Sequence, residues 1–501
     1  MDFEQEKGSL SDTAADLVVA GIFEGEAPKK AIAKMDPRFP ARFARQVELA
    51  CTAESFEGKP GQLVVLPTYE QLPAKKLLIC GLGKASDYRP GASRKLTANL
   101  ARRLRDNKFY RSVCFVLRAD GDLREHVQAA VEGYLLGSWS FFKYKSSDRD
   151  KPKSKIDLVT ISGANLAARA FAEAARAGEV IACATNFARD LIAEPAGYMT
   201  PTRLSQEARR IARETGLICT IMDVPQLEKL KMGALLGVAR GAHEPPRFII
   251  LKHDHPSAKK TIAVAGKGIT FDSGGLSLKP AQSMEHMKYD MSGAAAVIAT
   301  MQVVGLLKPK VNVLAVVAAT ENMPGGAALH PGDVVTALNG KTIEVNNTDA
   351  EGRLILADAL SYVVKENPDE IVDIATLTGG IVTALGRAAA GVMGNDQRLV
   401  DRLIAAGEQA GERLWQMPLF DEYKDYLKSD VADLKNAGSR GEAASSAGGM
   451  FLKEFVDGKP WAHLDIAGPG WVDREKDEVN KGGTAFGVRT LCRYLCSHGR
   501  D

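Results

Sequence analysis

The chain has few of the residues that define disulfide-rich, zinc-ribbon and histidine-based metal proteins. Its seven cysteines are scattered over 501 residues and contain no C-x-x-C pair, which argues against a disulfide framework or a zinc ribbon. Its eight histidines form no H-E-x-x-H pattern and no obvious cluster in the sequence. We therefore expect a cytoplasmic protein whose cysteines are buried apolar side chains.

Long apolar runs and a strong net charge are also missing. The net charge of +3 comes from 65 basic and 62 acidic residues, so nothing global favours nucleic acid or a membrane as the main partner. No run approaches 18 apolar residues, and the polar, acidic start of the chain does not resemble a signal peptide. With 45% hydrophobic and 25% charged residues, the composition is typical of a soluble globular enzyme of two or three domains.

Short apolar runs alternate with helical patterns along the whole chain, which predicts α/β layers with largely parallel strands. The predicted strands include 17–22, 63–66, 77–80, 113–117, 156–161, 248–251, 262–265, 311–319, 371–377 and 461–466. The predicted helices include 94–106, 123–137, 201–215, 294–307 and 353–365. An alanine-rich helical pattern over 164–192 suits a connector, so we expect domains at 1–163 and 193–501.

Two short stretches, within 266–293 and 347–354, carry an unusual number of charged residues. They contain four acids and three bases: Asp272, Asp290, Asp349, Glu351, Lys267, Lys279 and Arg353. Lys267 is expected just past the end of the predicted strand 262–265, and sites in α/β sheets collect at the carboxyl ends of strands. Such a set can hold two divalent cations about 3.5–4 Å apart, because four carboxylates balance their charge. A lysine can join the ligands only when neutral, which nearby cations and burial favour.

Each of these residues also has a simpler explanation. Asp290 could cap the helix that follows it, and Thr348 could cap the helix after Glu351. The glycine-rich stretch 267–275 could cradle phosphate, although it lacks the G-x-x-x-x-G-K-[ST] pattern. His286 is best explained as a neighbour of the site. Helix caps account poorly for all seven charged residues together.

The same stretches resemble the signatures of the leucyl aminopeptidase, or cytosol aminopeptidase, family. Residues 347–354 (NTDAEGRL) match the family's hallmark octapeptide, and 267–279 with 287–291 match its other core motif. The resemblance covers about 185–490 and includes 232–236, 330–335, 375–379, 427–436 and 463–468. It implies a two-domain α/β fold. A smaller N-terminal, macro-like domain would precede a larger catalytic domain with a mixed, largely parallel sheet.

The resemblance also implies roles for individual residues. The metal ligands would be Lys267, Asp272, Asp290, Asp349 and Glu351, forming one tight and one exchangeable site for Mn²⁺ or Zn²⁺. Lys279 and Arg353 match the catalytic pair that does not bind metal, and Arg353 would hold a bicarbonate ion that acts as general base. The residues that match substrate-binding positions are Met287, Thr376, Leu377, Gly379 and Ala467.

The expected activity is the release of N-terminal residues, preferably Leu or other apolar ones, from peptides by a metal-activated water. The family implies a homo-hexamer, and some members also bind DNA. Here the basic residues are Arg94, Lys95, Arg102, Arg103, Arg105, Lys108 and Arg111, for which a solvated helix face is the better explanation. Two-metal phosphoester hydrolysis is a rival activity, which the missing histidine cluster disfavours.

Overall fold

The computed structural model describes residues 1–118, 121–151, 153–438 and 441–498. It divides into two compact units. Unit 1 contains Met1–Cys183 and the short segment Lys476–Asn480, and unit 2 contains Ala184–Glu475 and the chain from Lys481 onward. The long helix α5 (Ala168–Ala193) runs from the first unit into the second along the chain.

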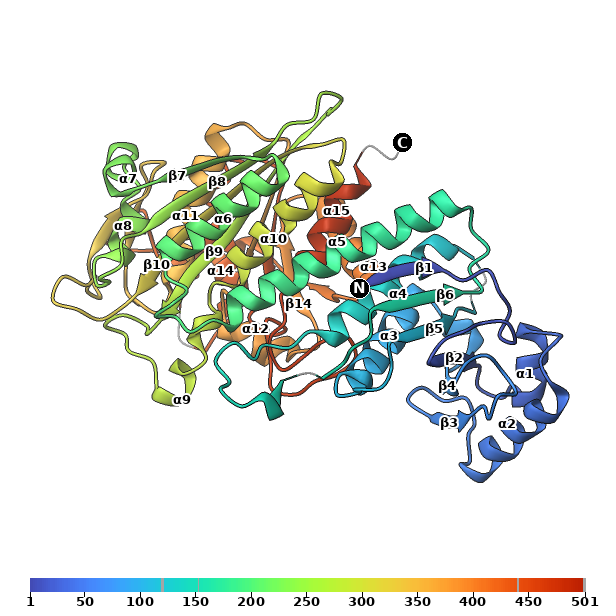
Figure 1. Cartoon of the computed structure of the whole chain (residues 1–501). Helices are drawn as coiled ribbons and strands as arrows, with labels where there is room; N and C mark the ends of the chain where they lie inside the picture. Colours follow the sequence, from blue (N-terminus) through green and yellow to red (C-terminus); the bar gives the residue numbers. More distant parts are fainter. Residues whose placement is uncertain (119–120, 152, 439–440, 499–501) are drawn as a thin grey trace. The chain divides into compact units, whose positions relative to one another are not determined.

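Unit 1 is built on a six-stranded sheet (Figure 1). In sheet order its strands are β1 (Asp2–Gln5), β6 (Leu158–Ser162), β5 (Ser112–Val116), β2 (Leu17–Ile22), β4 (Lys76–Gly81) and β3 (Leu63–Pro67). Only β3 is antiparallel to its neighbour. Side chains alternate between the faces of β2. Val18, Ala20 and Ile22 pack with α1 (Pro28–Met35) and α2 (Ala41–Ala53), whereas Leu17 and Val19 pack with α3 (Pro90–Leu104) and α4 (Leu123–Ser138).

Unit 2 is built on an eight-stranded mixed sheet. In sheet order its strands are β15 (Leu414–Gln416), β14 (Ala390–Gly394), β17 (Trp461–Asp465), β13 (Glu370–Ala375), β9 (Thr261–Asp272), β10 (Asn312–Asn322), β8 (Arg247–His253) and β7 (Ile218–Met222). The central strands β17, β13, β9 and β10 are all parallel. Their carboxyl ends therefore meet at one edge of the sheet, where binding sites in α/β folds are found.

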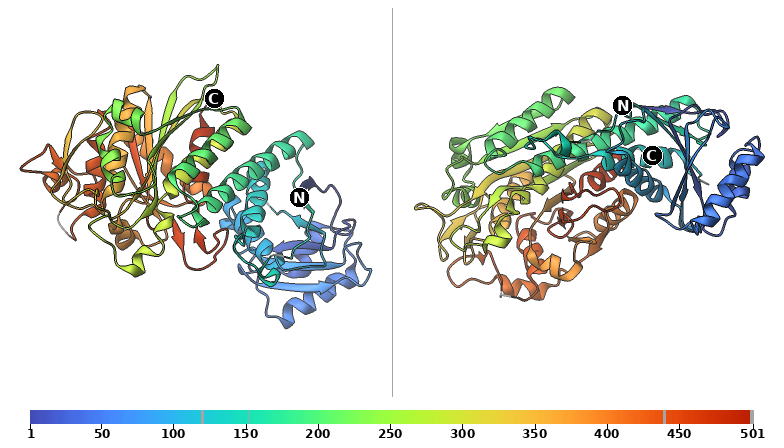
Figure 2. Two further views of the ribbon diagram at one scale, coloured as in Figure 1. Left: turned by 60° about the vertical axis from the view of Figure 1, so that its left-hand side comes forward. Right: turned by 60° about the horizontal axis from the view of Figure 1, so that its bottom comes forward.

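Helices cover both faces of this sheet (Figures 1 and 2). Helices α6 (Pro201–Thr215), α10 (Ser292–Leu307), α13 (Gln397–Ala410) and α15 (Val488–Ser497) lie on one face. Helices α8 (Gly233–Ala239), α11 (Glu351–Lys365) and α14 (Ala444–Lys453) lie on the other. The α/β prediction with two domains and a largely parallel catalytic sheet is confirmed.

The helical stretch Met287–Leu307 is long and apolar enough for a membrane span by length and composition alone, with a mean hydropathy of 1.5. However, 83% of the window is buried inside the protein. Helix α10, which forms most of the stretch, is apolar all round because it packs against β9, β10 and β13 on one side and α15 and α6 on the other. It is a core helix of unit 2.

The expectation of a solvated basic face is wrong for Arg94. Its guanidinium is fully buried and its Nε lies 2.8 Å from Glu132 Oε2, which is also buried. Arg102 donates to the backbone oxygen of Asp477 at 2.6 Å. The basic residues of this stretch therefore do not form one continuous exposed surface.

Candidate active site

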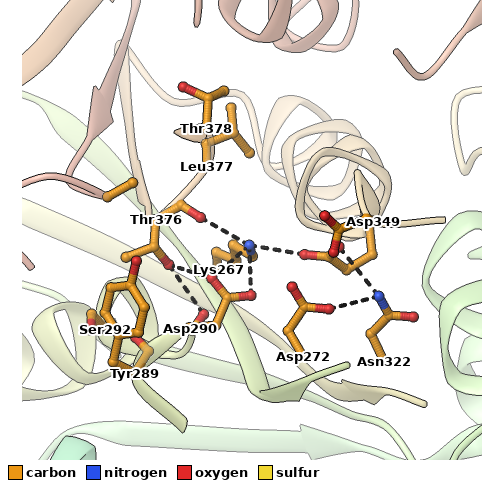
Figure 3. Close-up of polar contacts among 12 residues, drawn as sticks. Lys267, Asp272, Tyr289, Asp290, Ser292, Asn322, Asp349, Thr376, Leu377 and Thr378 are labelled. Carbon is orange, nitrogen blue, oxygen red and sulfur yellow. Dashed lines mark hydrogen bonds and ion pairs between the residues drawn. The ribbon is translucent and has the colours of Figure 1, made fainter. Parts of the chain in front are cut away.

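The charged residues of the two sequence stretches meet at the carboxyl ends of the central parallel strands (Figure 3). Lys267 and Asp272 both lie within β9, so the prediction that this strand ends before Lys267 is wrong. The strand continues because its pairing with β10 continues through Lys267 opposite Ala318 and, after a register shift, Asp272 opposite Asn322. Lysine and glycine interrupt the apolar run without interrupting these backbone hydrogen bonds.

The neighbouring acids come from two helix starts. Asp290 follows a 3₁₀ turn (Met287–Tyr289), while Asp349 and Glu351 lie before and at the start of α11. Neither capping explanation holds. Met291 and Ala350 are the N-cap residues of α10 and α11, and neither makes a side-chain cap bond.

Thr348 ties two loops together instead of capping a helix. Its hydroxyl donates to Gly274 O at 2.7 Å and accepts from Ser277 N at 2.8 Å. These bonds fix the glycine-rich loop after β9 against the segment that carries Asp349.

Three buried carboxylates form the centre of the site. One oxygen from each of Asp272, Asp290 and Glu351 lies within 4.8 Å of the other two. Lys267 Nζ contacts Asp290 Oδ2 at 2.7 Å, Glu351 Oε1 at 2.9 Å and the backbone oxygen of Thr376 at 3.0 Å.

Asp349 lies at the edge of this group and is partly exposed. Lys279 Nζ lies 2.5 Å from Asp349 Oδ1 and 2.8 Å from Asp272 Oδ2. Lys279 therefore joins Asp349 to the buried group.

Asn322, at the end of β10, was missed by sequence reasoning. Its amide nitrogen donates to Asp272 Oδ1 at 2.8 Å, to Thr348 O at 3.0 Å and to Glu351 Oε2 at 3.3 Å. It orients two carboxylates at once. The available signal was its place at the end of a buried run that neighbours the strand of Lys267.

Negative charge is in excess at this site, and the pKa values show the result. Burial, together with the charge of Glu351, raises the pKa of Asp272 to about 6. Burial also raises the pKa of Asp290, against the effect of Lys267. Burial alone would lower the pKa values of Lys267 and Lys279, but the surrounding carboxylates raise both. Four acids thus compete for two ammonium groups in a poorly solvated space.

Arg353 lies in the first turn of α11 and is buried. It donates from Nη1 to Asn436 O at 2.5 Å, whereas its Nε is buried without a hydrogen-bond partner among the described residues. Burial lowers the pKa of Arg353 to about 10, against the effect of Glu351 and Asp465, so the guanidinium stays charged at neutral pH.

The acids and both lysines line a cavity of about 280 Å³. The cavity also contains every residue proposed for substrate binding: Met287, Thr376, Leu377, Gly379 and Ala467. Arg353 lines an adjoining cavity of about 220 Å³, which shares Asp349, Leu377, Thr378 and Gly379 with the first. His286 stacks on Trp471, with ring centroids 5.2 Å apart, and is not among the residues that line either cavity.

This donor set fits divalent cations. Its oxygens are carboxylates, which hard and borderline divalent ions prefer, and its buried excess of negative charge is of the size that such ions compensate. The residues that could hold an ion are Asp272, Asp290 and Glu351, with Asp349 and Lys267 beside them.

Comparison with known proteins places this arrangement in a family. Residues 186–492 match the catalytic domain of the cytosol aminopeptidase family, and residues 19–148 match the N-terminal domain of the same family. A probable cytosol aminopeptidase of Alkaliphilus oremlandii is 40% identical over 99% of both chains. One of Gloeobacter violaceus is 42% identical over 99% of both chains.

Solved structures are similar over the same extent. A mutant of tomato leucine aminopeptidase has a TM-score of 0.89 at 35% identity, over 99% of this chain and 97% of its own. The bottromycin maturation enzyme BotP, solved in complex with Mn, has a TM-score of 0.84 at 36% identity, over 97% and 99%. The chain therefore belongs to the cytosol aminopeptidase family and is a metallo-aminopeptidase.

Proposed function

We propose that the chain is a two-metal aminopeptidase that removes apolar N-terminal residues, Leu among them, from peptides. The observation that carries the proposal is the group of four carboxylates and two lysines that line one cavity. Asp272, Asp290 and Glu351 would hold one cation with Lys267, whose ammonium would give up its proton on binding, because only a neutral lysine can be a ligand. Asp272, Asp349 and Glu351 would hold a second, more exchangeable cation. Mn²⁺ and Zn²⁺ both suit these ligands.

Bound divalent cations would polarise the scissile carbonyl and lower the pKa of a water towards neutrality. The surrounding carboxylates raise the pKa of Lys279, which favours its ammonium form. Cations would take over the neutralisation of Asp272 and Asp349, which leaves the Lys279 ammonium to stabilise negative charge on the carbonyl oxygen.

Arg353 would hold the proton acceptor. Its buried Nε lacks a partner among the described residues, and a planar guanidinium binds small oxyanions through two parallel hydrogen bonds. A bicarbonate ion in the adjoining cavity would suit this geometry and act as general base, because the four acids of the site are assigned to the cations.

The side chain of the N-terminal residue would lie against Met287, Thr376 and Ala467, which are uncharged and line the cavity. Burying an unpaired carboxylate there is costly. Leu and Met amides should therefore be hydrolysed faster than Asp amides.

The test combines metal content with activity. Stepwise dialysis against a chelator, followed by mass spectrometry of bound metal, should show one ion lost readily and one retained. Hydrolysis of a panel of aminoacyl amides should fall with the first ion. Full activity in metal-free protein would refute the two-metal proposal, and a preference for Asp amides would refute the pocket assignment alone.

We further propose a cytoplasmic homo-hexamer, following the family resemblance. Light scattering would distinguish it from a single chain of 53.8 kDa. DNA binding is not proposed, because Arg94 is buried and Arg102 is held by the backbone of Asp477.

A further inference from the structure

Asp465, at the carboxyl end of β17, has no role in the chemistry above but is fully buried beside the cavity. Its Oδ1 accepts from the backbone N–H groups of Leu377 at 3.2 Å, Thr378 at 3.5 Å and Ala467 at 3.2 Å. Its Oδ2 accepts from the Thr378 hydroxyl at 2.6 Å. One carboxylate thus joins two segments that are about ninety residues apart in the sequence.

Both segments form walls of the substrate cavity. Leu377, Thr378 and Gly379 from one segment and Ala467 from the other all line this cavity. Thr378 is also the N-cap of α12 (Gly379–Leu385), and its hydroxyl lies 2.9 Å from Ser445 Oγ at the start of α14. A change at Asp465 would therefore move groups that lie beside the N-terminal residue of a substrate.

A second buried pair, His463 and Asp373, joins β17 to the adjacent strand β13. His463 and Asp465 are two apart on β17 and project from the same face. His463 Nδ1 lies 2.5 Å from Asp373 Oδ1 on the adjacent strand β13, and Trp461 Nε1 donates to Asp373 Oδ2 at 2.6 Å. All four side chains are fully buried.

The electrostatics agree with this arrangement. Burial raises the pKa of Asp465, and the charge of His463 opposes that rise. Burial would lower the pKa of His463, but Asp373 and Asp465 raise it. The positive charge of Arg353 on α11 opposes this rise in the pKa of His463.

We propose that Asp465 is a positioning residue for specificity. It fixes Leu377, Thr378 and Ala467 around the side chain of the substrate's N-terminal residue, and the Asp373–His463 pair supports it from within the sheet. The inference rests on the proposed function, because it assigns the cavity walls to that side chain. It adds a determinant outside the predicted metal, catalytic and pocket residues.

The test is the ratio of kcat/KM for Leu amide to that for Gly amide. This ratio does not depend on the fraction of enzyme that is folded, so a loss of stability alone leaves it unchanged. Asp465→Asn keeps the side-chain shape, but only one of its two ends can still accept hydrogen bonds, and its NH2 group can no longer accept the proton of the Thr378 hydroxyl. The ratio should fall about tenfold, with metal content retained, which is the scale at which a pocket discriminates small apolar groups.

Asp358→Asn is the matched control. Asp358 on α11 is also fully buried and accepts from two backbone N–H groups, Leu235 at 2.8 Å and Leu338 at 2.7 Å, but it does not line the cavity. Its replacement should lower the melting temperature and leave the Leu-to-Gly ratio at the parent value. His463→Gln should shift the ratio in the same direction as Asp465→Asn, by less.

An unchanged ratio in soluble Asp465→Asn would overturn the inference, as would an equal fall in the Asp358→Asn control. If Asp465→Asn does not fold, an unchanged ratio in His463→Gln overturns it instead. A parent enzyme that does not hydrolyse Leu amide faster than Asp amide would contradict the proposed function, a result separate from these.

Discussion

Buried carboxylates at the two ends of the eight-stranded sheet have pKa values shifted in opposite directions. At the amino end of β13, Glu370 lies 2.7 Å from Lys260 Nζ and 2.9 Å from Arg402 Nη2, and it accepts the Tyr494 hydroxyl. Burial alone would raise the pKa of Glu370, but these three donors lower it to about 2. At the carboxyl end, Asp272 and Asp290 share two lysines with two more acids and have raised pKa values.

The difference separates a stabilising carboxylate from a ligand-binding one. A carboxylate surrounded by donors lowers the free energy of the folded state. Carboxylates that outnumber their donors raise the free energy of the folded state until a ligand binds. Groups with such perturbed pKa values mark functional sites. Burial is common to both ends, so the balance of charge is what identifies the site.

The largest expected effect is at the carboxyl end. Glu351→Gln removes a charge that lies 2.9 Å from Lys267 and is shared in the proposal by both cations. Hydrolysis of Leu amide should fall by at least about a thousandfold, because the Lewis-acid contribution of several kcal/mol is lost, and mass spectrometry should show metal loss. Glu370→Gln, the same substitution at the other end, is the control and should retain metal and rate. Retained metal in Glu351→Gln would refute its ligand role.

The next largest effect distinguishes the two lysines at the carboxyl end of the sheet. Lys279→Ala should lower kcat by about 10²–10³-fold, the usual loss when one charge-stabilising donor is removed. Both metals should remain, because Lys279 is assigned to the substrate carbonyl. Lys267→Ala should differ by losing metal as well as rate. A metal-depleted Lys279→Ala variant would show that Lys279 supports the ions.

Much of this architecture could be predicted from local patterns. Helix α6 (Pro201–Thr215) and strand β2 (Leu17–Ile22) have the predicted bounds, since Pro201 and Gly216 delimit the helix and all six residues of the strand are apolar. The proposed metal-binding and catalytic residues lie in two compact motifs, and the structure brings them to one cavity and its neighbour.

The remaining features depend on partners far away in the sequence. β9 extends to Asp272 because β10 pairs with it. The Lys and Gly residues in the sequence of β9 do not indicate this extension. Asn322 contacts groups 26 to 50 residues away. Asp465 contacts Leu377 and Thr378, which are 88 and 87 residues away, so the roles of these two residues could not be inferred from their local sequence. The charge balance at Glu370 likewise requires side chains from α13 and α15.

The smallest expected effect on activity is at the amino end. Glu370→Gln should leave kcat/KM unchanged. It should lower the free energy of unfolding by about 2–3 kcal/mol at pH 7, because the pKa of Glu370 in the folded protein is well below its value in the unfolded chain. Glu366→Gln, which removes a partly exposed pair with Lys252, is the control and should cost about 0.5 kcal/mol or less.

The pH dependence gives this prediction its sign. The pKa of Glu370 is about 2 in the folded protein and near 4.5 in the unfolded chain, so its contribution is complete above pH 4.5 and is lost as the pH falls towards 2. Melting temperatures of parent and variant should therefore differ by several degrees at pH 7. At pH 4 the gap should be narrower by an amount equivalent to about 1 kcal/mol. If the difference in melting temperature widens on acidification, Glu370 is not held ionised by its three partners. The proposed difference between the two ends of the sheet would then be wrong.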